Sequence, residues 1–487
     1  MSQLKELLYG VNIDAVHGST HVHIRNLRFN SSQVGLDDLF VAIKGATADG
    51  HQFIQDAINK GALVVVCEQF PQTEIGGITY VKVPDTKTAL AIIAANFYEN
   101  PAQKLYLVGV TGTNGKTTVS TLLYKLFTRL GYKCGLISTV KIAIGDKDLP
   151  ATHTTPDVVQ TNQLLAQMLD HGVTHCFMEV SSHGIHQRRV YGLDFDAAIF
   201  TNLSHDHLDY HKTFEAYRDT KKLLFDQLKK TAHAITNADD KNGAFMLQNT
   251  KAKKHTYALK SYADFKAKIL ENDFSGIKLK IDENELWVRL VGSFNAYNVL
   301  AVYSCAQALG EDAFSVLEAI SALEAVEGRF QHFVSATGIH LIVDYAHTPD
   351  ALENVLSTIN DIRSNNETLY TIVGCGGNRD SEKRPIMAAI AAQNSNKVVL
   401  TSDNPRFESP ETILEEMQKG IQPQFAAKVI TITDRAQAIA TACQMAQPGD
   451  ILLIAGKGHE KYQEINGNRR PFDDFQQCKD ELIKLEK

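Results

Sequence analysis

The chain has 487 residues, of which 44% are hydrophobic and 22% are charged, and this length suggests about three domains of ordinary size. Lysine and arginine number 49 against 56 aspartate and glutamate residues, which gives a formal net charge of −7. A mildly acidic chain argues against nucleic-acid binding through the overall electrostatic field. The apolar fraction excludes a disordered or collagen-like chain.

The N-terminal stretch MSQLKELLYGVNID lacks the basic start and apolar core of a secretory signal, and no apolar run is long enough to cross a bilayer. The seven cysteines are scattered singly, without a Cys-x-x-Cys pair. This pattern favours a reducing compartment and provides neither a disulfide framework nor a zinc site. We therefore expect a cytoplasmic protein with no membrane insertion and no nucleic-acid partner.

The first stretch of the chain combines short apolar runs at 39–43, 63–67 and 78–83 with a helical pattern in which Leu90, Ile93 and Phe97 recur. Asn100-Pro101 then interrupts the chain, because the residue before a proline is disfavoured in a helix. From Leu105 onward apolar strands alternate with helical segments, which is typical of parallel sheets with crossover helices. A second break near residue 332 predicts three domains: 1–98, 99–331 and 332–487.

Chemically unusual residues follow the carboxyl end of each predicted buried strand. Open α/β sheets bind ligands in the crevice beyond those strand ends, so we expect these residues to form sites. The alternative is a chance cluster of polar loop residues. The seven predicted strands are 105–110, 176–180, 198–202, 341–344, 369–373, 398–401 and 451–455.

The sharpest motif is Gly-Val-Thr-Gly-Thr-Asn-Gly-Lys-Thr-Thr at 109–118, between a predicted strand and a helix that runs to about Leu130. Gly112 and Gly115 allow backbone N–H groups and the helix N-terminus to face an anion. Lys116 adds a positive charge for the outer phosphates, and Thr117 can join a Mg2+ shell. We predict nucleoside triphosphate binding by Gly112, Thr113, Asn114, Gly115, Lys116, Thr117 and Thr118, and the loop alone leaves kinase, GTPase and motor functions open. Because Val110 stands where the common motif has its first glycine, a glycine-rich turn with an incidental lysine remains the alternative.

A second group of polar residues comprises Glu179 at a strand end and the segment Thr-Asn-Leu-Ser-His-Asp-His-Leu-Asp-Tyr-His at 201–211. An acid and a His/Asp cluster near a phosphate loop suggest a hard divalent cation such as Mg2+. Zinc binding by His207 and His211 is an alternative, but no third nitrogen or sulfur ligand is evident.

The Gly-Thr-Asn-Gly-Lys-Thr-Thr loop resembles that of the ATP-dependent Mur ligases and their folylpolyglutamate synthetase relatives, which join an amino acid to a carboxylate through an acyl phosphate. The resemblance implies metal binding by Thr117, Glu179, His207 and Lys221. It identifies Lys221 with a lysine that family members carry as a carbamate. The neighbouring Lys222 is a competing candidate, and composition alone would place both lysines on a solvated helix face. The resemblance also assigns nucleotide contacts to Asn295, Asn298, Arg329 and Asp344, with Arg329 counted among the catalytic residues beside Lys116, Glu179, His207 and Lys221.

Three C-terminal segments, at 374–380, 403–406 and 455–460, resemble the Mur ligase branch that adds the third residue of the peptidoglycan stem peptide. Asp-Asn-Pro-Arg at 403–406 is the form associated with meso-diaminopimelate, whose extra carboxylate suits an arginine fork. The resemblance assigns this substrate to Arg379, Asp403, Asn404, Pro405, Arg406, Gly456 and Glu460. Arg406 and Arg379 are the candidates for the carboxylate, and Asp403, Glu460 and the Gly456 backbone for the ammonium groups. By itself, Asp-Asn-Pro-Arg would be read as a plain turn.

The resemblance further implies UDP-N-acetylmuramoyl-L-alanyl-D-glutamate as the acceptor. Its expected contacts are Ser31, Thr154, Thr155, Ser181, Gln187 and Arg189. The N-terminal part matches the family pattern more loosely, since Asn30-Ser31-Ser32 stands where the family usually has Asp-Ser-Arg.

We therefore expect an α/β enzyme of three domains, with a central P-loop-type, mostly parallel sheet and a C-terminal Rossmann-like domain. The expected activity is ATP-dependent amide ligation, with ATP, Mg2+ and a CO2-derived carbamate on Lys221, in a monomer. The nearest alternative is a ligase that adds L-lysine. A nucleotide-binding switch would share the phosphate loop, but Lys221, Glu179 and the C-terminal arginines would have no evident role in it. A folylpolyglutamate synthetase would also share the loop, but it would not need the N-terminal pattern of the UDP site.

Overall fold

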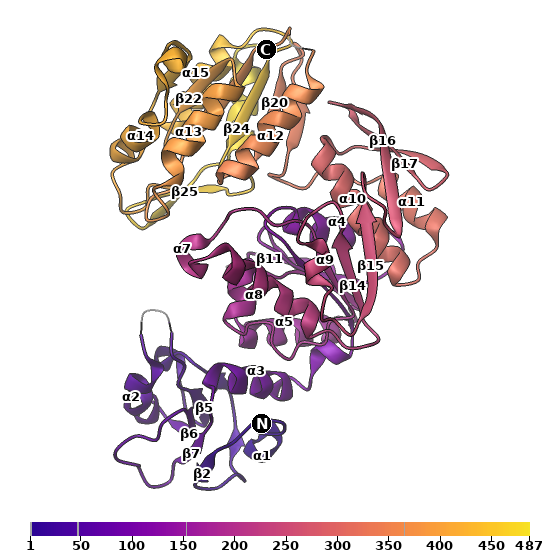
Figure 1. The fold of residues 1–487 in the computed structure, drawn as a ribbon. Helices are drawn as coiled ribbons and strands as arrows, with labels where there is room; N and C mark the ends of the chain where they lie inside the picture. The colour runs from indigo at the N-terminus through magenta and orange to yellow at the C-terminus, as the bar shows by residue number, and fades with distance from the viewer. Residues whose placement is uncertain (1, 46–47, 152, 365) are drawn as a thin grey trace.

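The computed structural model describes residues 2–45, 48–151, 153–364 and 366–487. Three regions follow one another along an elongated molecule, and each has its own β-sheet with helices packed against it (Figure 1). The described residues form sheets of five, eleven and six strands, together with two small two-stranded sheets. The α/β class with three domains is thereby confirmed, and the boundaries near residues 98 and 332 stay a prediction.

The first region contains a five-stranded sheet in the order β2-β7-β6-β5-β4, parallel except for the β2–β7 pair. Its predicted helix is α3, which begins after Asp85, whose side chain accepts a hydrogen bond from the Lys87 N–H. Leu90 and Ile93 are buried against the sheet. The elements are β1 (Ser2–Gln3), α1 (Leu4–Leu7), β2 (Ala15–His17), β3 (His23–Ile24), β4 (Leu27–Arg28), β5 (Asp38–Val41), α2 (Ile54–Asn59), β6 (Ala62–Cys67), β7 (Thr79–Lys82) and α3 (Thr86–Phe97).

The central region holds the eleven-stranded sheet, in the order β11-β10-β9-β12-β8-β13-β14-β15-β16-β17-β18. Strands β9 to β16 in this order run parallel, and antiparallel strands extend both edges. Helices α4 and α10 cover one face of this sheet, and α5 and α8 cover the other. The strands are β8 (Tyr106–Thr111), β9 (Cys134–Ile137), β10 (Ile142–Ile144), β11 (Lys147–Leu149), β12 (His175–Glu179), β13 (Ala197–Phe200), β14 (His233–Asn237), β15 (Lys253–Ala258), β16 (Phe265–Asp273), β17 (Gly276–Ile281) and β18 (Asn284–Val288). The helices are α4 (Lys116–Arg129), α5 (Val158–Asp170), α6 (Ser182–His186), α7 (Leu208–His211), α8 (Phe214–Asp226), α9 (Gly243–Met246), α10 (Ser293–Ala308) and α11 (Ala313–Ser321).

The C-terminal region has a six-stranded sheet in the order β19-β20-β24-β21-β22-β23, parallel except for β19. Helices α12, α13 and α14 pack on one face, and α15 and α16 on the other, as expected for a doubly wound fold. Its strands are β19 (Gln331–Val334), β20 (His340–Asp344), β21 (Leu369–Val373), β22 (Lys397–Leu400), β23 (Val429–Thr431), β24 (Ile451–Ala455), β25 (Tyr462–Ile465) and β26 (Asn468–Pro471). Its helices are α12 (Pro349–Ile362), α13 (Lys383–Asn394), α14 (Pro410–Gln418), α15 (Arg435–Met445) and α16 (Asp474–Lys484).

All seven strands predicted to carry site residues are present, as β8, β12, β13, β20, β21, β22 and β24. Their bounds differ from the predicted ones by at most a few residues. The prediction succeeds because strands that are buried on both faces of a parallel sheet form continuous apolar runs. Within the described residues, no helix has the length and apolar character needed to span a membrane.

Candidate active site

The phosphate loop joins β8 to α4 and requires glycine at two positions. Gly112 has φ +153°, and a Cβ there would collide with the Thr201 side chain. Gly115 has φ +89°, and a Cβ there would lie 2.7 Å from Asn298 Oδ1. Lys116 Nζ donates to the carbonyls of Gly112 (3.0 Å) and Thr113 (2.8 Å), and burial lowers the pKa of Lys116. The loop therefore presents a cation and tightly turned backbone at the carboxyl end of β8.

The remaining loop residues are held by the segment after β13. Thr113 Oγ1 accepts a hydrogen bond from the Ser204 N–H at 3.0 Å, and the Asn114 N–H donates to Asn202 Oδ1 at 2.9 Å. Thr118 is buried in the first turn of α4. These contacts fix the loop between two neighbouring strands of the central sheet.

Glu179 and Thr117 form the centre of the predicted metal site. Glu179 ends β12, is 1% exposed, and accepts hydrogen bonds from Thr117 Oγ1 (3.0 Å) and the Thr139 N–H (2.7 Å). Arg329, from beyond the central sheet, donates through Nη2 to Thr117 Oγ1 at 3.0 Å. The Arg329 guanidinium also lies over the Tyr345 ring, 4.5 Å from its centroid. A carboxylate, a hydroxyl and an arginine from a distant part of the chain thus meet at the phosphate loop.

Lys221, on α8, contacts the backbone of the phosphate loop. It is 1% exposed, and its Nζ donates to Gly112 O at 2.8 Å. Burial and the nearby Lys116 charge lower the pKa of Lys221 well below its ordinary value. Lys222 differs, because its Nζ forms an ion pair with Asp226 at 2.5 Å. The two adjacent lysines therefore have different surroundings, and only Lys221 lies at the phosphate loop.

His207 precedes the short helix α7 in the left-handed region, with φ +55°. Its Nε2 lies 3.3 Å from Asp206 Oδ2, and burial lowers its pKa to about 4. The described residues contain no group of three or more His, Cys, Asp or Glu side chains arranged to hold a metal ion. The zinc alternative is therefore not supported, since zinc requires three or four clustered nitrogen, sulfur or carboxylate ligands. The paired oxygens of Glu179 and Thr117 do fit Mg2+, which binds through one or two side chains, waters and substrate phosphates.

The predicted acceptor contacts form a hydrogen-bonded group beside Glu179. Thr155 Oγ1 donates to Glu179 O at 2.9 Å and lies 3.1 Å from Ser181 Oγ. Arg189 donates to Thr155 O (2.7 Å) and to Gln187 Oε1 (2.7 Å). Thr154 joins the group through Thr139, whose Oγ1 donates to Thr154 Oγ1 at 3.0 Å. Ser31 lies in the first region and makes no hydrogen bond to this group in the described part of the chain.

Asn295 and Asn298 lie in the first turns of α10, where sequence reasoning without the family would place helix-cap residues. Asn298 Nδ2 donates to Asn295 Oδ1 at 2.9 Å, and Asn295 Nδ2 donates to Val291 O at 2.8 Å. The Asn298 oxygen is the atom that a side chain at Gly115 would meet. This pair is therefore packed against the phosphate loop, and it also makes local contacts within α10.

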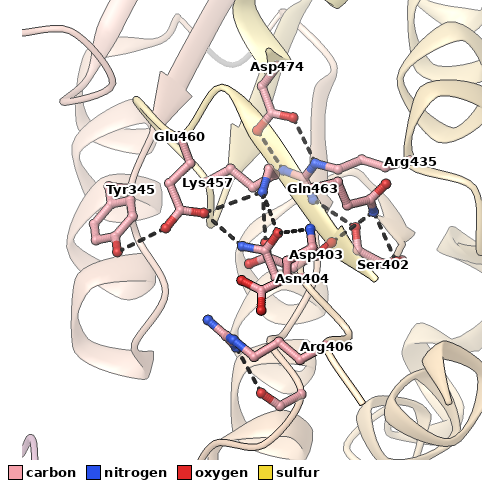
Figure 2. Close-up of polar contacts among 12 residues, drawn as sticks. Tyr345, Ser402, Asp403, Asn404, Arg406, Arg435, Lys457, Glu460, Gln463 and Asp474 are labelled. Carbon is pink, nitrogen blue, oxygen red and sulfur yellow. Dashed lines mark hydrogen bonds and ion pairs between the residues drawn. The ribbon is translucent and has the colours of Figure 1, made fainter. Parts of the chain in front are cut away.

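A separate cluster lies at the carboxyl ends of β22 and β24 (Figure 2). Asn404 Nδ2 donates to Glu460 Oε2 at 2.8 Å. Lys457, which is fully buried, donates to Asn404 Oδ1 at 3.0 Å. The positive φ of Gly456, +116°, keeps the backbone open beside Asp403, whose Oδ2 would lie 3.2 Å from a Cβ at Gly456. Asp403, Asn404, Gly456 and Glu460 are thereby brought together, as predicted for one ligand.

Arg406 borders this cluster and follows Pro405, which is buried. Its Nη1 donates to Gly377 O at 2.8 Å, and no carboxylate in the described residues forms an ion pair with it. Arg379 is exposed on the neighbouring loop. A Cβ at Gly376 would lie 2.9 Å from Arg406 Nη1 and 3.9 Å from Arg379 Cγ, so the two arginines flank the same glycine. The site therefore combines acids with an arginine that has no ion-pair partner among the residues that the structure describes.

Comparison with known proteins places this arrangement in a family. Residues 110–306 match the Mur ligase middle domain, residues 328–458 the Mur ligase glutamate ligase domain, and residues 23–98 the catalytic domain of the Mur ligase family. The chain is 54% identical over 473 residues to the UDP-N-acetylmuramoyl-L-alanyl-D-glutamate--2,6-diaminopimelate ligase of Cytophaga hutchinsonii, covering 97% of both chains. The chain belongs to the Mur ligase family.

Further relatives of this Mur ligase match it over nearly its whole length. The protein of the same name from Phocaeicola vulgatus is 51% identical over 478 residues, covering 98% of this chain and 99% of that protein. A solved structure of a UDP-N-acetylmuramoyl-L-alanyl-D-glutamate--2,6-diaminopimelate ligase superposes with a TM-score of 0.70 and 33% identity, covering 100% of this chain and 99% of that one. MurF from Acinetobacter baumannii, at 16% identity and a TM-score of 0.65, covers 100% of this chain and 99% of its own and shares the fold.

Asp350 is a contact residue of this Mur ligase that sequence reasoning did not single out. Its Oδ2, at the start of α12, accepts hydrogen bonds from Asn114 Nδ2 (2.7 Å) and Ser204 Oγ (2.8 Å). Asp350 therefore links the C-terminal region to the phosphate loop. The sequence feature that could have identified Asp350 is its position at the end of the segment Val-Asp-Tyr-Ala-His-Thr-Pro-Asp (343–350), which also contains Asp344.

Replacing Asp350 with alanine is expected to lower kcat/KM for ATP by about tenfold or more. The reason is that hydrogen bonds to a charged group each contribute about 1.5–3 kcal/mol, and Asp350 accepts one from Asn114 of the phosphate loop and one from Ser204, in the segment that holds the loop. Steady-state kinetics at varied ATP checks this. Glu353→Ala, on the exposed face of the same helix, serves as the control. Equal kinetics for the two variants would contradict the prediction.

Asp344 is buried at the end of β20, and its Oδ2 accepts the Phe330 N–H at 2.6 Å. Burial raises the pKa of Asp344 to about 6, although Arg329 and the Phe330 N–H oppose the change. A folded-state pKa above the unfolded value, about 4, means that stability is lost as pH rises through this interval. Asp344→Asn removes this titration. The melting temperature of the variant relative to the wild type should therefore increase between pH 4 and pH 6, and a constant difference would rule this out.

Proposed function

We propose that this Mur ligase adds meso-2,6-diaminopimelate to UDP-N-acetylmuramoyl-L-alanyl-D-glutamate, in an ATP-dependent reaction that passes through an acyl phosphate. Phosphate transfer of this kind depends mainly on positioning and charge stabilisation. A cytoplasmic location belongs to the same proposal, because ATP and a nucleotide-linked precursor are the substrates. The proposal also includes a monomeric state. The predicted domains 1–98, 99–331 and 332–487 would mainly bind the acceptor, ATP and the amino acid, respectively.

The observation that carries the ligase proposal is the meeting of Thr117, Glu179 and Arg329. Lys116 and Arg329 provide positive charge for ATP phosphates, while Glu179 and Thr117 would hold Mg2+. When bound, Mg2+ would neutralise phosphate charge during attack by the acceptor carboxylate. Arg329 comes from the junction with the C-terminal region and already lies at the phosphate loop, 3.0 Å from Thr117 Oγ1, so the packing of that region against the loop would place its charge at the phosphates and exclude water from the acyl phosphate.

We also propose a carbamate on Lys221. The neutral amine attacks CO2, a C–N bond forms as one C=O π bond of CO2 opens, and one proton leaves to solvent, so that the neutral amine becomes an anionic carbamate whose oxygens can bind a metal ion. The buried position of Lys221, the depressed pKa and the absence of a carboxylate ion pair among the described residues all favour the neutral amine. His207 would complete this metal environment, together with Glu179.

Specificity for diaminopimelate rests on Arg406. Diaminopimelate carries a carboxylate beside its distal ammonium, and Arg406 has a guanidinium without an ion-pair partner in the described chain. Lysine would leave this arginine unpaired, at a cost of about 1–3 kcal/mol or more. A site built for a polar group rejects the analogue that lacks it. The L-lysine-adding activity is the alternative.

The deciding experiment measures phosphate release from ATP with the UDP-dipeptide acceptor, with diaminopimelate or lysine supplied separately. We expect release that depends on both the acceptor and diaminopimelate. Phosphate release that depends on lysine but not on diaminopimelate would overturn the proposed specificity. The absence of acceptor-dependent release with either amino acid would overturn the proposed ligase activity. Lys116→Met should be inactive. Lys125→Met, which removes a lysine from the same helix outside the loop, is the matched control and should remain active.

A further inference from the structure

Lys457 follows β24 and is completely buried, although it belongs to neither of the groups expected to contact ATP or the acceptor. We propose that Lys457 is a positioning residue that sets the charge balance of the amino-acid site and thereby its preference for a zwitterionic side-chain end. This inference rests on the proposed function, because it concerns the selectivity of the same site. It assigns Lys457 no direct contact with the reacting atoms.

Three polar side chains surround the Lys457 ammonium (Figure 2). Its Nζ donates to Asn404 Oδ1 at 3.0 Å and lies 3.4 Å from Glu460 Oε2 and 3.5 Å from Asp403 Oδ1. An ammonium has donors only, so it determines which end of the Asn404 amide faces it. The Asn404 amide nitrogen consequently faces Glu460, to which it donates at 2.8 Å. Lys457 thus orients both Asn404 and Glu460.

Two ion pairs lie beside this cluster. Arg435 and Asp474, both fully buried, form a two-pronged ion pair with distances of 2.7 Å and 2.7 Å. Arg435 also donates to Ser402 O and Ala455 O, the carbonyls that precede Asp403 and Gly456. Glu464 is paired with Arg469 at 3.4 Å. These pairs hold the strand ends in place and contribute little net charge.

The charge that remains matches one kind of ligand end. Asp403 and Glu460 are negative and Lys457 is positive, which leaves one negative charge for an ammonium. Arg406, with the exposed Arg379 at the edge of the site, supplies positive charge for a carboxylate. The site is therefore balanced for an ammonium and a carboxylate side by side. Without Lys457 the balance becomes more negative, which favours a ligand end that carries an ammonium alone.

The test compares kcat/KM for meso-diaminopimelate with kcat/KM for L-lysine, which is supplied at high concentration. It uses the wild type, Lys457→Met and Glu460→Gln, with one control variant. Lys457→Met should lower the diaminopimelate-to-lysine ratio by about tenfold or more, since it removes the positive charge that lies 3.4 Å from Glu460 and 3.5 Å from Asp403, the proposed ammonium-binding acids. Glu460→Gln removes a negative charge and should raise the same ratio. KM for ATP should change little in both variants. Opposite changes are expected only if charge balance determines the preference.

Lys428→Met is the matched control, because Lys428 is a partly buried lysine of the same region that donates to Ser395 O. It should leave the ratio unchanged. Equal losses with both amino acids in Lys457→Met would show a merely structural role and overturn the proposal. If Lys457→Met does not fold, as judged by thermal unfolding, Glu460→Gln decides: an unchanged or lower ratio overturns the proposal. The amino acid preferred by the wild-type protein tests the proposed function. The changes in the ratio between variants and wild type test the role of Lys457, so failure of one can be distinguished from failure of the other.

Discussion

Replacing Lys221 with alanine is expected to reduce acceptor-dependent phosphate release to background. The lysine is buried against the phosphate loop, with its Nζ 2.8 Å from Gly112 O, and its lowered pKa favours the neutral amine that reacts with CO2. Alanine removes the amine and therefore the proposed anionic metal ligand. Loss of a group that stabilises charge in the transition state typically costs about 100-fold or more in kcat.

The measurement is phosphate release by Lys221→Ala with and without high bicarbonate, together with 13C NMR of the wild type in labelled bicarbonate. Bicarbonate should not rescue the variant, and a carbamate signal should be present only when Lys221 is present. Lys222→Ala is the neighbouring control, and it should retain turnover because Lys222 is paired with Asp226 away from the loop. Near-normal turnover in Lys221→Ala would show that the carbamate assignment is wrong.

Replacing Arg406 with lysine should lower kcat/KM for diaminopimelate by about 100-fold and have a much smaller effect on lysine. A guanidinium binds a carboxylate through two parallel hydrogen bonds, whereas an ammonium acts as a single point of charge. Arg406 also has φ +51° and an N–H that donates to Glu464 O at 3.0 Å. These backbone contacts remain in the variant, so the change should affect recognition more than folding.

The kinetic comparison uses saturating ATP and acceptor, with each amino acid varied in turn. Arg363→Lys provides the control, since Arg363 lies at the end of α12 and donates to Asn396 Oδ1. Arg379→Lys should have an intermediate effect, because Arg379 is exposed at the edge of the site. If Arg406→Lys impairs both amino acids equally, recognition of the extra carboxylate lies elsewhere.

Much of the fold could be predicted from local pattern. The runs 369–373 and 451–455 coincide with β21 and β24, because strands covered by helices on both faces are continuously apolar. The helix after the phosphate loop ends near Leu130, where Gly131 takes φ +95°. The cluster formed by Asp403, Asn404 and Glu460 was likewise expected, since the carboxyl ends of parallel strands meet at one edge of the sheet, where β22 and β24 are separated only by β21.

The sequence by itself determined the α/β class, the phosphate loop and the family resemblance, because these depend on spacing along the chain. Only the tertiary structure distinguished Lys221 from Lys222, since neighbouring residues on a helix point in different directions. It also revealed Asp350 beside Asn114 and Lys457 between Asp403 and Glu460. Asn114 and Asp350 are 236 residues apart, and no local pattern encodes such a contact. Burial and hydrogen-bond partners decide the surroundings and orientation of these groups, and both arise only when distant segments pack together.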